Sequence, residues 1–119
     1  MDNEAPEVAA RMTELADPVD LAPHLSRAGK TLVFFEISGC PYCGAFEPRF
    51  LEFAGKRSGD FNLLRVKLDD PANPLWEKYA IRAVPTVIVF ERGEVVARAD
   101  SVLALGLTKR MWAEFCAGI

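Results

Sequence analysis

Residues 31–57 read TLVFFEISGCPYCGAFEPRFLEFAGKR and join two segments of contrasting pattern. The first, Thr31 to Ile37, is a short apolar run rich in β-forming residues, which predicts a central strand buried on both faces. From Pro41 to Arg57 the pattern becomes helical, because phenylalanines recur at i, i+4 and i+7. Cys40 and Cys43 fall where the predicted strand passes into the predicted helix.

This junction gives the first thiol a position suited to nucleophilic chemistry. Cys40 directly follows the strand and Pro41 opens the helix, so Cys40 is expected at the helix N-terminus. Unpaired N–H groups and the helix dipole favour a thiolate there. Cys43 lies one helical turn further in, where it can attack a mixed disulfide formed on Cys40 while being shielded from solvent. The spacing therefore predicts a dithiol that cycles between oxidised and reduced states.

The first thirty residues are expected to be helical. Val8, Met12 and Leu15 are spaced at i, i+4 and i+7, which predicts a short amphipathic helix. A second short helix is predicted to begin at Asp17–Pro18, as N-cap and first helical position, and to end at Gly29.

After residue 30, strands and helices alternate. The expected elements are a strand at 31–37, a helix at 41–57 kinked at Pro48, a strand at 62–69, a short helix at 73–79, two strands at 86–90 and 95–99 joined at Gly93, and a C-terminal helix with Leu107, Met111 and Phe115 on one face. This order predicts an α/β fold with a central mixed β-sheet, mostly parallel with an antiparallel hairpin edge, flanked by helices. We expect a single domain over 1–119, with a helical N-terminal segment at 1–30 and the core at 31–119.

Composition excludes several classes of function. Half of the 119 residues are hydrophobic and the net charge is −3, which argues against a nucleic-acid or anionic-membrane binder. No stretch approaches the ~20 apolar residues needed to cross a bilayer. The acidic N-terminus lacks the apolar region of a signal peptide. We therefore expect a cytoplasmic monomer without nucleic-acid or membrane partners; the periplasm is the alternative if a signal peptide has been removed.

The remaining cysteine and the single histidine do not favour a metal site. A tetrahedral zinc site would need all three cysteines together with His24 or a carboxylate, and no second CxxC supports it. Cys116, near the end of the last predicted helix, is interpreted as a small buried hydrophobe. The Cys40–Cys43 pair is itself the redox group, so no metal or organic cofactor is expected.

The chain resembles the thioredoxin-fold superfamily from about Thr31 to its C-terminus. The likeness is clearest over residues 67–98, KLDDPANPLWEKYAIRAVPTVIVFERGEVVAR. It implies that Val84–Pro85 is the cis-proline pair facing the CxxC, where backbone groups pair with an extended substrate segment. Pro41 and Tyr42, between the cysteines, are further candidates for substrate contact.

The active-site loop departs from the thioredoxin pattern. Thioredoxins typically carry Trp-Cys-Gly-Pro-Cys, whereas this chain has Gly39 before the first cysteine and Pro-Tyr inside the motif. Cys-Pro-Tyr-Cys is the glutaredoxin insert, but the Gly-Gly that helps to hold glutathione is missing, with Ser101 near the expected position. The motif also resembles Dsb-type oxidases, yet the spacing from Cys43 to Pro85 leaves no room for their helical insertion.

The resemblance implies a thiol-disulfide oxidoreductase in which Cys40 is the nucleophile and Cys43 the resolving cysteine. Its partners would be protein disulfide substrates and an upstream thiol or reductase that donates electrons. The alternatives are a glutathione-coupled, glutaredoxin-like activity and a periplasmic Dsb-type redox protein. A non-enzymatic docking or chaperone module is the alternative from a different class.

The proton of Cys43 needs a different acceptor from the one in thioredoxins, because Phe34 stands where thioredoxins bury an aspartate. Glu47 is i+4 from Cys43 and so shares its helical face. Lys67 matches the strand lysine that partners the buried acid in thioredoxins. We hypothesise that Glu47 and Lys67 pair beneath Cys43 and move its proton, with Glu36 as the rival acceptor.

Overall fold

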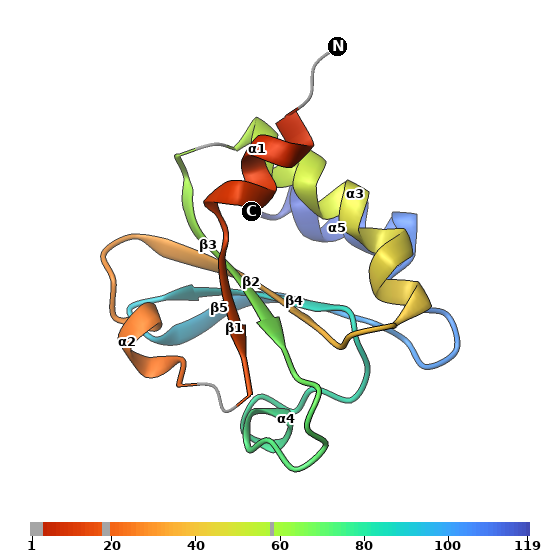
Figure 1. Cartoon of the computed structure of the whole chain (residues 1–119). Coiled ribbons are helices and arrows are strands. Elements are labelled where there is room, and N and C mark those ends of the chain that lie inside the picture. The colour runs from red at the N-terminus through yellow and green to blue at the C-terminus, as the bar shows by residue number, and fades with distance from the viewer. Residues whose placement is uncertain (1–3, 18–19, 58) are drawn as a thin grey trace.

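The computed structural model describes residues 4–17, 20–57 and 59–119, and a twisted five-stranded sheet runs through its centre (Figure 1). The elements are α1 (Glu4–Arg11), β1 (Thr13–Ala16), α2 (Ala22–Leu25), β2 (Lys30–Glu36), α3 (Pro41–Lys56), β3 (Phe61–Lys67), α4 (Leu75–Lys78), β4 (Thr86–Glu91), β5 (Glu94–Asp100) and α5 (Lys109–Ala117). After residue 30, the order of strands and helices is the predicted one, and α3 runs through Pro48.

The sheet has the strand order β1-β3-β2-β4-β5. β3 runs parallel to both β1 and β2, whereas β4 runs antiparallel to β2 and β5. The sheet is therefore mixed, as expected, but antiparallel pairing extends beyond the hairpin edge, so the sheet is not mostly parallel. The reason is where the chain re-enters the sheet after α4. Thr86, the first residue of β4, lies opposite Phe35, which pairs with Val66 near the end of β3, so β4 starts at the edge where β3 stops and runs back.

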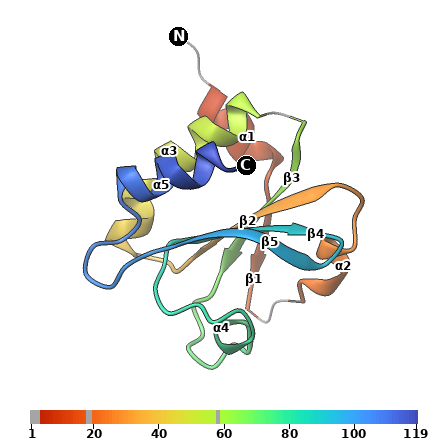
Figure 2. The same cartoon turned by 180° about the vertical axis from the view of Figure 1, so that it is seen from behind.

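Helices cover both faces of the sheet. Helices α1, α3 and α5 lie on one face, and α2 and α4 lie on the other, in both views of the molecule (Figures 1 and 2). Each layer has its own apolar cluster against the sheet. The sheet consequently separates two cores, and its central strand has to be apolar on both sides.

The central strand β2 confirms the prediction made for it. Every residue of β2 except Lys30 is buried. Leu32 and Phe34 belong to the cluster under α3 and α5, whereas Val33 and Phe35 belong to the cluster under α2 and α4. The alternation follows from the two-residue period of a strand, which sends successive side chains to opposite faces.

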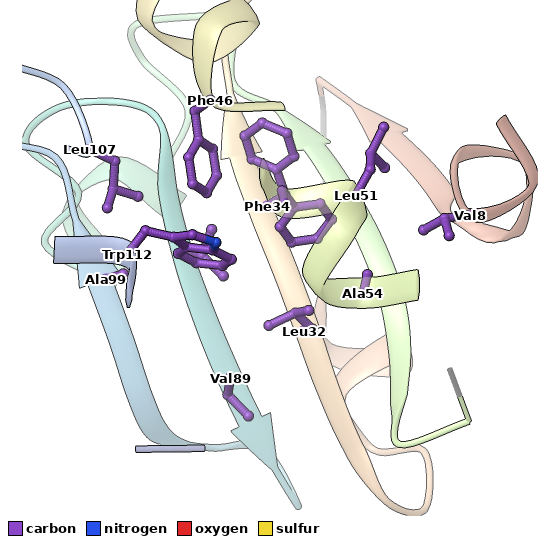
Figure 3. Packing of buried hydrophobic residues seen from close by; sticks show 12 residues of the cluster. Val8, Leu32, Phe34, Phe46, Leu51, Ala54, Val89, Ala99, Leu107 and Trp112 are labelled. Carbon is purple, nitrogen blue, oxygen red and sulfur yellow. The ribbon is translucent and has the colours of Figure 1, made fainter. Parts of the chain in front are cut away.

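Aromatic side chains pack α3 and α5 onto β2. The ring of Phe46 meets the rings of Phe34 and Trp112 edge-on, with centroids 5.6 and 4.8 Å apart. Phe50 lies 5.0 Å from Phe34 and is fully buried. Figure 3 shows Phe34, Phe46 and Trp112 gathered between α3 and the sheet. The predicted spacing of phenylalanines on α3 thus marks its buried face, with Phe46 and Phe50 at the centre.

The N-terminal segment differs from its prediction. The first helix ends at Arg11, and Leu15 lies in β1, where it pairs with Val66 of β3. The segment 1–30 is therefore not wholly helical, and the sheet begins before residue 31. Pairing with β3 stabilises an extended conformation that the helical spacing of apolar residues did not indicate.

The second helix begins later than the sequence predicts. Helix α2 begins at Ala22, so Asp17 is not its N-cap. The Asp17 carboxylate instead accepts hydrogen bonds from the backbone N–H of Asp70, at 2.6 Å, and from the side chain of Asn73. Pro18, expected at the first helical position, lies outside the described residues.

The C-terminal third confirms the hairpin and most of the last helix. Arg92 and Gly93 form the two-residue turn between β4 and β5, both with positive φ, at 54° and 82°. Such turns match the twist of paired strands and favour glycine. Helix α5 begins after Thr108, whose hydroxyl accepts a hydrogen bond from the N–H of Met111. Leu107 precedes the helix but is buried in the same cluster.

We predict that Phe50→Ala lowers the free energy of unfolding by about 3–5 kcal/mol, because it removes a fully buried ring from the centre of the α3 face. Urea unfolding of the reduced protein measures the change. Leu103→Ala, at a side chain that is 73% exposed, is the matched control and should cost less than about 0.5 kcal/mol. A loss below about 1 kcal/mol for Phe50→Ala would contradict the packing described above.

Candidate active site

The two cysteines lie at the start of α3, as the strand-to-helix junction predicted. Cys40 is the N-cap residue, with an extended backbone, and its sulfur accepts a hydrogen bond from the backbone N–H of Cys43 at 3.1 Å. Gly39 precedes it with φ of +73°, a conformation that favours glycine, and allows the chain to turn from strand to helix. Both cysteines are free thiols in this structure.

The two thiols differ in exposure and in ionisation. Cys40 is partly exposed, whereas only 2% of Cys43 is accessible. Burial raises the pKa of Cys43 from 9.0 to about 12, and the hydrogen bond to Cys40 and the negative charges of Cys40 and Glu36 act in the same direction. A backbone hydrogen bond at Ile37 opposes the shift. Cys43 therefore needs a proton acceptor before it can act as a nucleophile.

A cavity beside the cysteine pair brings charged side chains to this buried thiol. It is lined by Cys40 and Cys43 and by residues of three elements: Glu36 of β2, Gly44 and Glu47 of α3, and Arg65 and Lys67 of β3, with Ile37, Ser38, Gly39 and Pro41 completing it. All three residues proposed from the sequence for proton transfer thus line the same cavity. The fourth charged residue, Arg65, was not anticipated.

Arg65 is the centre of the charged cluster. Its guanidinium donates hydrogen bonds to the carboxylates of Glu36 and Glu47, each at 2.5 Å. The central guanidinium carbon, Cζ, lies 5.2 Å from the centre of the Phe34 ring. The side chains of Arg65 and Glu36 are only 12% exposed. Burial lowers the pKa of Arg65, but the bonds to both carboxylates outweigh that effect and raise it. Arg65 therefore keeps its positive charge, which compensates the negative charges of Glu36 and Glu47 in this cavity.

The predicted ion pair between Glu47 and Lys67 is wrong. Glu47 binds Arg65, and the ammonium group of Lys67 lies 3.1 Å from the carboxylate of Glu14 on β1. The cause is the strand β1, which pairs with β3 and brings an acidic side chain to Lys67. Arg65 is two residues before Lys67 and so shares its face of the strand. This alternation was the signal in the sequence that could have identified Arg65.

Tyr42, inside the CPYC motif, contacts the loop that follows β5. Its hydroxyl donates a hydrogen bond to the carbonyl of Ala104 at 2.9 Å. The ring lies so close to Gly106 that a β-carbon added there would be 2.8 Å from it. The side chain is 45% exposed. The sequence predicts Tyr42 as a candidate for substrate contact, but it does not indicate that a segment 62 residues away lies against it.

The Val84–Pro85 segment lies at the same end of the sheet as the cysteines. The next residue, Thr86, is opposite Phe35 in the pairing of β4 with β2, and β2 leads directly to the motif. The Val84–Pro85 peptide bond is cis. The hydroxyl of Ser101 donates a hydrogen bond to the carbonyl of Pro85, which joins the end of β5 to this segment.

Two hydrogen bonds between Ser38 and Asp69 hold the turn that precedes the motif. The backbone N–H and the hydroxyl of Ser38 donate hydrogen bonds to the carboxylate of Asp69, at 2.7 and 2.8 Å. These bonds lower the pKa of Asp69. Ser38 stands two residues before Cys40, so the turn is tied to the end of β3. Sequence reasoning did not assign this role to either residue.

A partly exposed thiol at a helix start, with a buried thiol one turn later, is suited to thiol-disulfide exchange. The thioredoxin family model matches residues 10–116. The chain is similar to a thioredoxin of Mycoplasmoides gallisepticum, with 32% identity over 84 residues, 71% of this chain and 82% of that protein. The chain belongs to the thioredoxin family.

The chain is also similar to a second relative and to two solved structures. The probable thioredoxin-2 of Caenorhabditis elegans is 36% identical over 72 residues, which are 60% of this chain and 49% of that protein. Thioredoxin f from spinach chloroplast superimposes with a TM-score of 0.70 at 19% identity, over 97% of this chain and 91% of that one. Mitochondrial thioredoxin 3 of Saccharomyces cerevisiae superimposes with a TM-score of 0.68 at 13% identity, over 94% of this chain and 99% of that one. These two structures show the fold alone.

The protein is thus a thiol-disulfide oxidoreductase whose redox group is a cysteine pair. Thioredoxins work without a cofactor. Within residues 4–17, 20–57 and 59–119, no three or more histidine, cysteine, aspartate or glutamate residues gather in a way that could hold a metal ion. Over the same residues, no helix has the length and apolar character needed to cross a membrane.

We predict that the reduced protein loses stability at alkaline pH through Cys43. The folded thiol keeps its proton up to a pKa of about 12, whereas an unfolded thiol loses it near 9.0. The stabilising contribution is therefore complete below about pH 9 and is lost as the pH rises towards 12. The measurement is the free energy of unfolding between about pH 8 and 10, under reducing conditions, for wild type and Cys43→Ala. The decline with pH should be shallower in the variant.

Cys116→Ala is the comparison variant for this titration. Burial raises the pKa of Cys116 to about 11, so both thiols keep their protons in the folded state over this pH range, and Cys116→Ala should flatten the pH dependence by nearly as much. Equal slopes in wild type and Cys43→Ala would contradict the description of Cys43 as a buried, protonated thiol.

Proposed function

We propose that this protein reduces disulfides in protein substrates, with Cys40 as the nucleophile and Cys43 as the resolving cysteine. The observation that carries the proposal is the contrast between Cys40, which is partly exposed at the helix start, and Cys43, of which only 2% is exposed. A substrate disulfide can approach Cys40, whereas Cys43 is reached from within the protein. Membership of the thioredoxin family supports the same direction of electron transfer.

The reaction takes two exchanges. The Cys40 thiolate attacks one sulfur of the substrate, a mixed disulfide forms, and the other substrate sulfur leaves as a thiolate. Cys43 then gives up its proton and attacks the Cys40 sulfur. The mixed disulfide breaks, the second substrate thiolate leaves, and the Cys40–Cys43 disulfide forms. Two electrons pass to the substrate, and an upstream thiol or reductase returns them to the protein.

The substrate is proposed to lie along Val84 and Pro85, with Pro41 and Tyr42 at its side. The register of β4 and β2, which sets Thr86 opposite Phe35, supports this position next to the motif. An extended substrate segment would add to the backbone there as a further strand. We propose that residues 1–119 act as one domain and as a monomer. The reducing cytoplasm is the proposed compartment, since it supplies electrons to such a reductase.

The proton of Cys43 is proposed to pass to the carboxylates held by Arg65. Of the two carboxylates, Glu36 is the one whose negative charge raises the pKa of the Cys43 thiol. Glu47 lines the same cavity and is 36% exposed, so it connects the cluster to solvent. Arg65 is a positioning residue that holds both carboxylates towards the cavity. This cluster takes the place of the aspartate that Phe34 replaces.

Two substitutions test the assignment of the cysteines. Cys40→Ser should abolish reduction of insulin disulfides by the protein, and Cys43→Ser should accumulate a mixed disulfide through Cys40 that mass spectrometry detects. The reduction potential of the pair, measured against glutathione buffers, should lie near about −270 mV, the established figure for thioredoxins. A potential near about −120 mV would indicate an oxidant instead and would overturn the proposed direction.

Resolution of the mixed disulfide tests the carboxylates separately. Glu36→Gln should slow release of thionitrobenzoate from its mixed disulfide with Cys40 at least roughly tenfold at neutral pH, because the general base is lost. The rate should recover as the pH rises, when hydroxide takes the proton. Glu47→Gln should have a smaller effect, and Glu36→Asp should restore part of the rate. A Glu36→Gln variant with the wild-type rate and pH profile would eliminate Glu36 as the acceptor.

A further inference from the structure

A second cavity lies at the opposite end of β3 from the cysteine pair. It has a volume of about 320 Å³, and its lining includes Arg11, Thr13, Arg27, Phe61, Asn62 and Leu63. We call it the arginine cavity. Phe61 is the first residue of β3, whereas Lys67, which lines the cavity beside the cysteines, is the last. Six steps along a strand span roughly 20 Å, so the redox chemistry does not account for the two arginines.

The arginine cavity lies where one side of β3 has no neighbouring strand. β2 pairs with β3 from Phe61 onwards, but β1 joins it only at Leu64, which pairs with Thr13. Within the residues that the structure describes, positions 61–63 of β3 therefore have a strand partner on one side only. Such an edge presents backbone N–H and C=O groups that a ligand can bind.

The two arginines come from helices on opposite faces of the sheet. Arg11 is the last residue of α1, and Arg27 follows α2, which lies on the other face (Figures 1 and 2). The side-chain amide of Asn62 donates a hydrogen bond to the carbonyl of Ala28 at 3.1 Å, and this bond ties the segment that carries Arg27 to β3. Both arginines line the same cavity, so they approach the edge of β3 from its two sides.

The positive charges at the arginine cavity are not compensated within the protein. Among the side chains that the structure describes, neither Arg11 nor Arg27 forms an ion pair with a carboxylate. Asp60, the acid adjacent to Phe61 in the chain, is already bound to Arg57 at 2.6 Å. The net charge of the whole chain is −3, so this positive site is a local feature. It attracts an anion.

We propose that the arginine cavity binds a small molecule through a phosphate group. Guanidinium groups bind phosphate oxygens in a bidentate geometry. A phosphate monoester carries a charge of about −1.5 to −2 at neutral pH, which balances both Arg11 and Arg27, whereas a single carboxylate would balance only one. The hydroxyl of Thr13 is a further donor for such an anion. This site goes beyond the proposed reductase activity and does not depend on it.

The arginine cavity has room for more than a phosphate ion. Its volume is about ten times the roughly 30 Å³ that one water molecule occupies in the liquid. Phe61 and Leu63, both partly buried, supply apolar wall beside the arginines. The volume is at the lower end of the roughly 300–1,000 Å³ range of small-molecule sites. A compact organic phosphate would therefore place its phosphate between the arginines and its remaining atoms against the apolar wall.

Titration calorimetry of the full chain tests the proposal with three probes: ribose 5-phosphate, inorganic phosphate and uncharged ribose. The wild-type protein should bind ribose 5-phosphate saturably and should not bind ribose. Arg11→Gln and Arg27→Gln should each weaken binding about tenfold, the effect of losing one charge-assisted hydrogen bond, and the double variant should show no binding. The amide resonances of Asn62 and Leu63 should shift on addition of ribose 5-phosphate.

Arg110→Gln is the matched control. It removes the same charge from a side chain on α5 that is 89% exposed, and it should keep the wild-type affinity. An unchanged circular dichroism spectrum and unfolding midpoint check that the double variant is folded. Both arginines are exposed, so their replacement should leave the core intact.

The two phosphate probes distinguish the sources of the ligand. Tighter binding of ribose 5-phosphate than of inorganic phosphate identifies an organic phosphate, and equal binding identifies inorganic phosphate; both results support a phosphate site. Absence of saturable binding by either probe, equal binding of ribose, binding that survives in the double variant, or an equal loss in Arg110→Gln would each overturn the inference. No disulfide is reduced in this experiment, so its failure is distinguishable from failure of the proposed reductase activity.

Discussion

The packing of α3 against β2 determines where the reactive sulfur lies. Phe46 and Phe50 hold the helix on Phe34 of the strand, and Trp112 of α5 closes over them. Because the helix begins where the strand ends, the same packing leaves Cys40 at the N-terminus and Cys43 one turn inside. The different exposures of the two thiols, on which the order of the two exchanges depends, follow from this aromatic layer.

That layer also accounts for the charges around Cys43. With an apolar ring at position 34, no carboxylate lies in the core at that point, and the nearest acid is two residues further along β2, at Glu36. A buried carboxylate needs a partner, and Arg65 supplies one while stacking on Phe34. Removing Arg65 would leave Glu36 and Glu47 without their shared cation, so the three residues form a unit.

The strands and helices after residue 30 were predictable because each shows its own periodicity and turn residues. The apolar run of β2, the phenylalanine spacing of α3 and the glycine between β4 and β5 are local signals. Strand β1 was missed because TELA is too short to show alternation and owes its conformation to β3. The wrong partner for Lys67 followed from that error, since Glu14 reaches it only from a strand. The antiparallel direction of β4 also depends on where a connection re-enters the sheet, which no local pattern records.

Sequence alone determined the chemistry of this protein: two cysteines two residues apart, between an apolar strand and a proline that opens a helix. That information is local, because the strand, the helix start and the spacing are adjacent in the chain. Tertiary structure decided what surrounds the thiols, namely Arg65 from β3 between two carboxylates and residues 102–106 against Tyr42. These contacts join segments far apart in the chain, so they exist only once the sheet has aligned its strands.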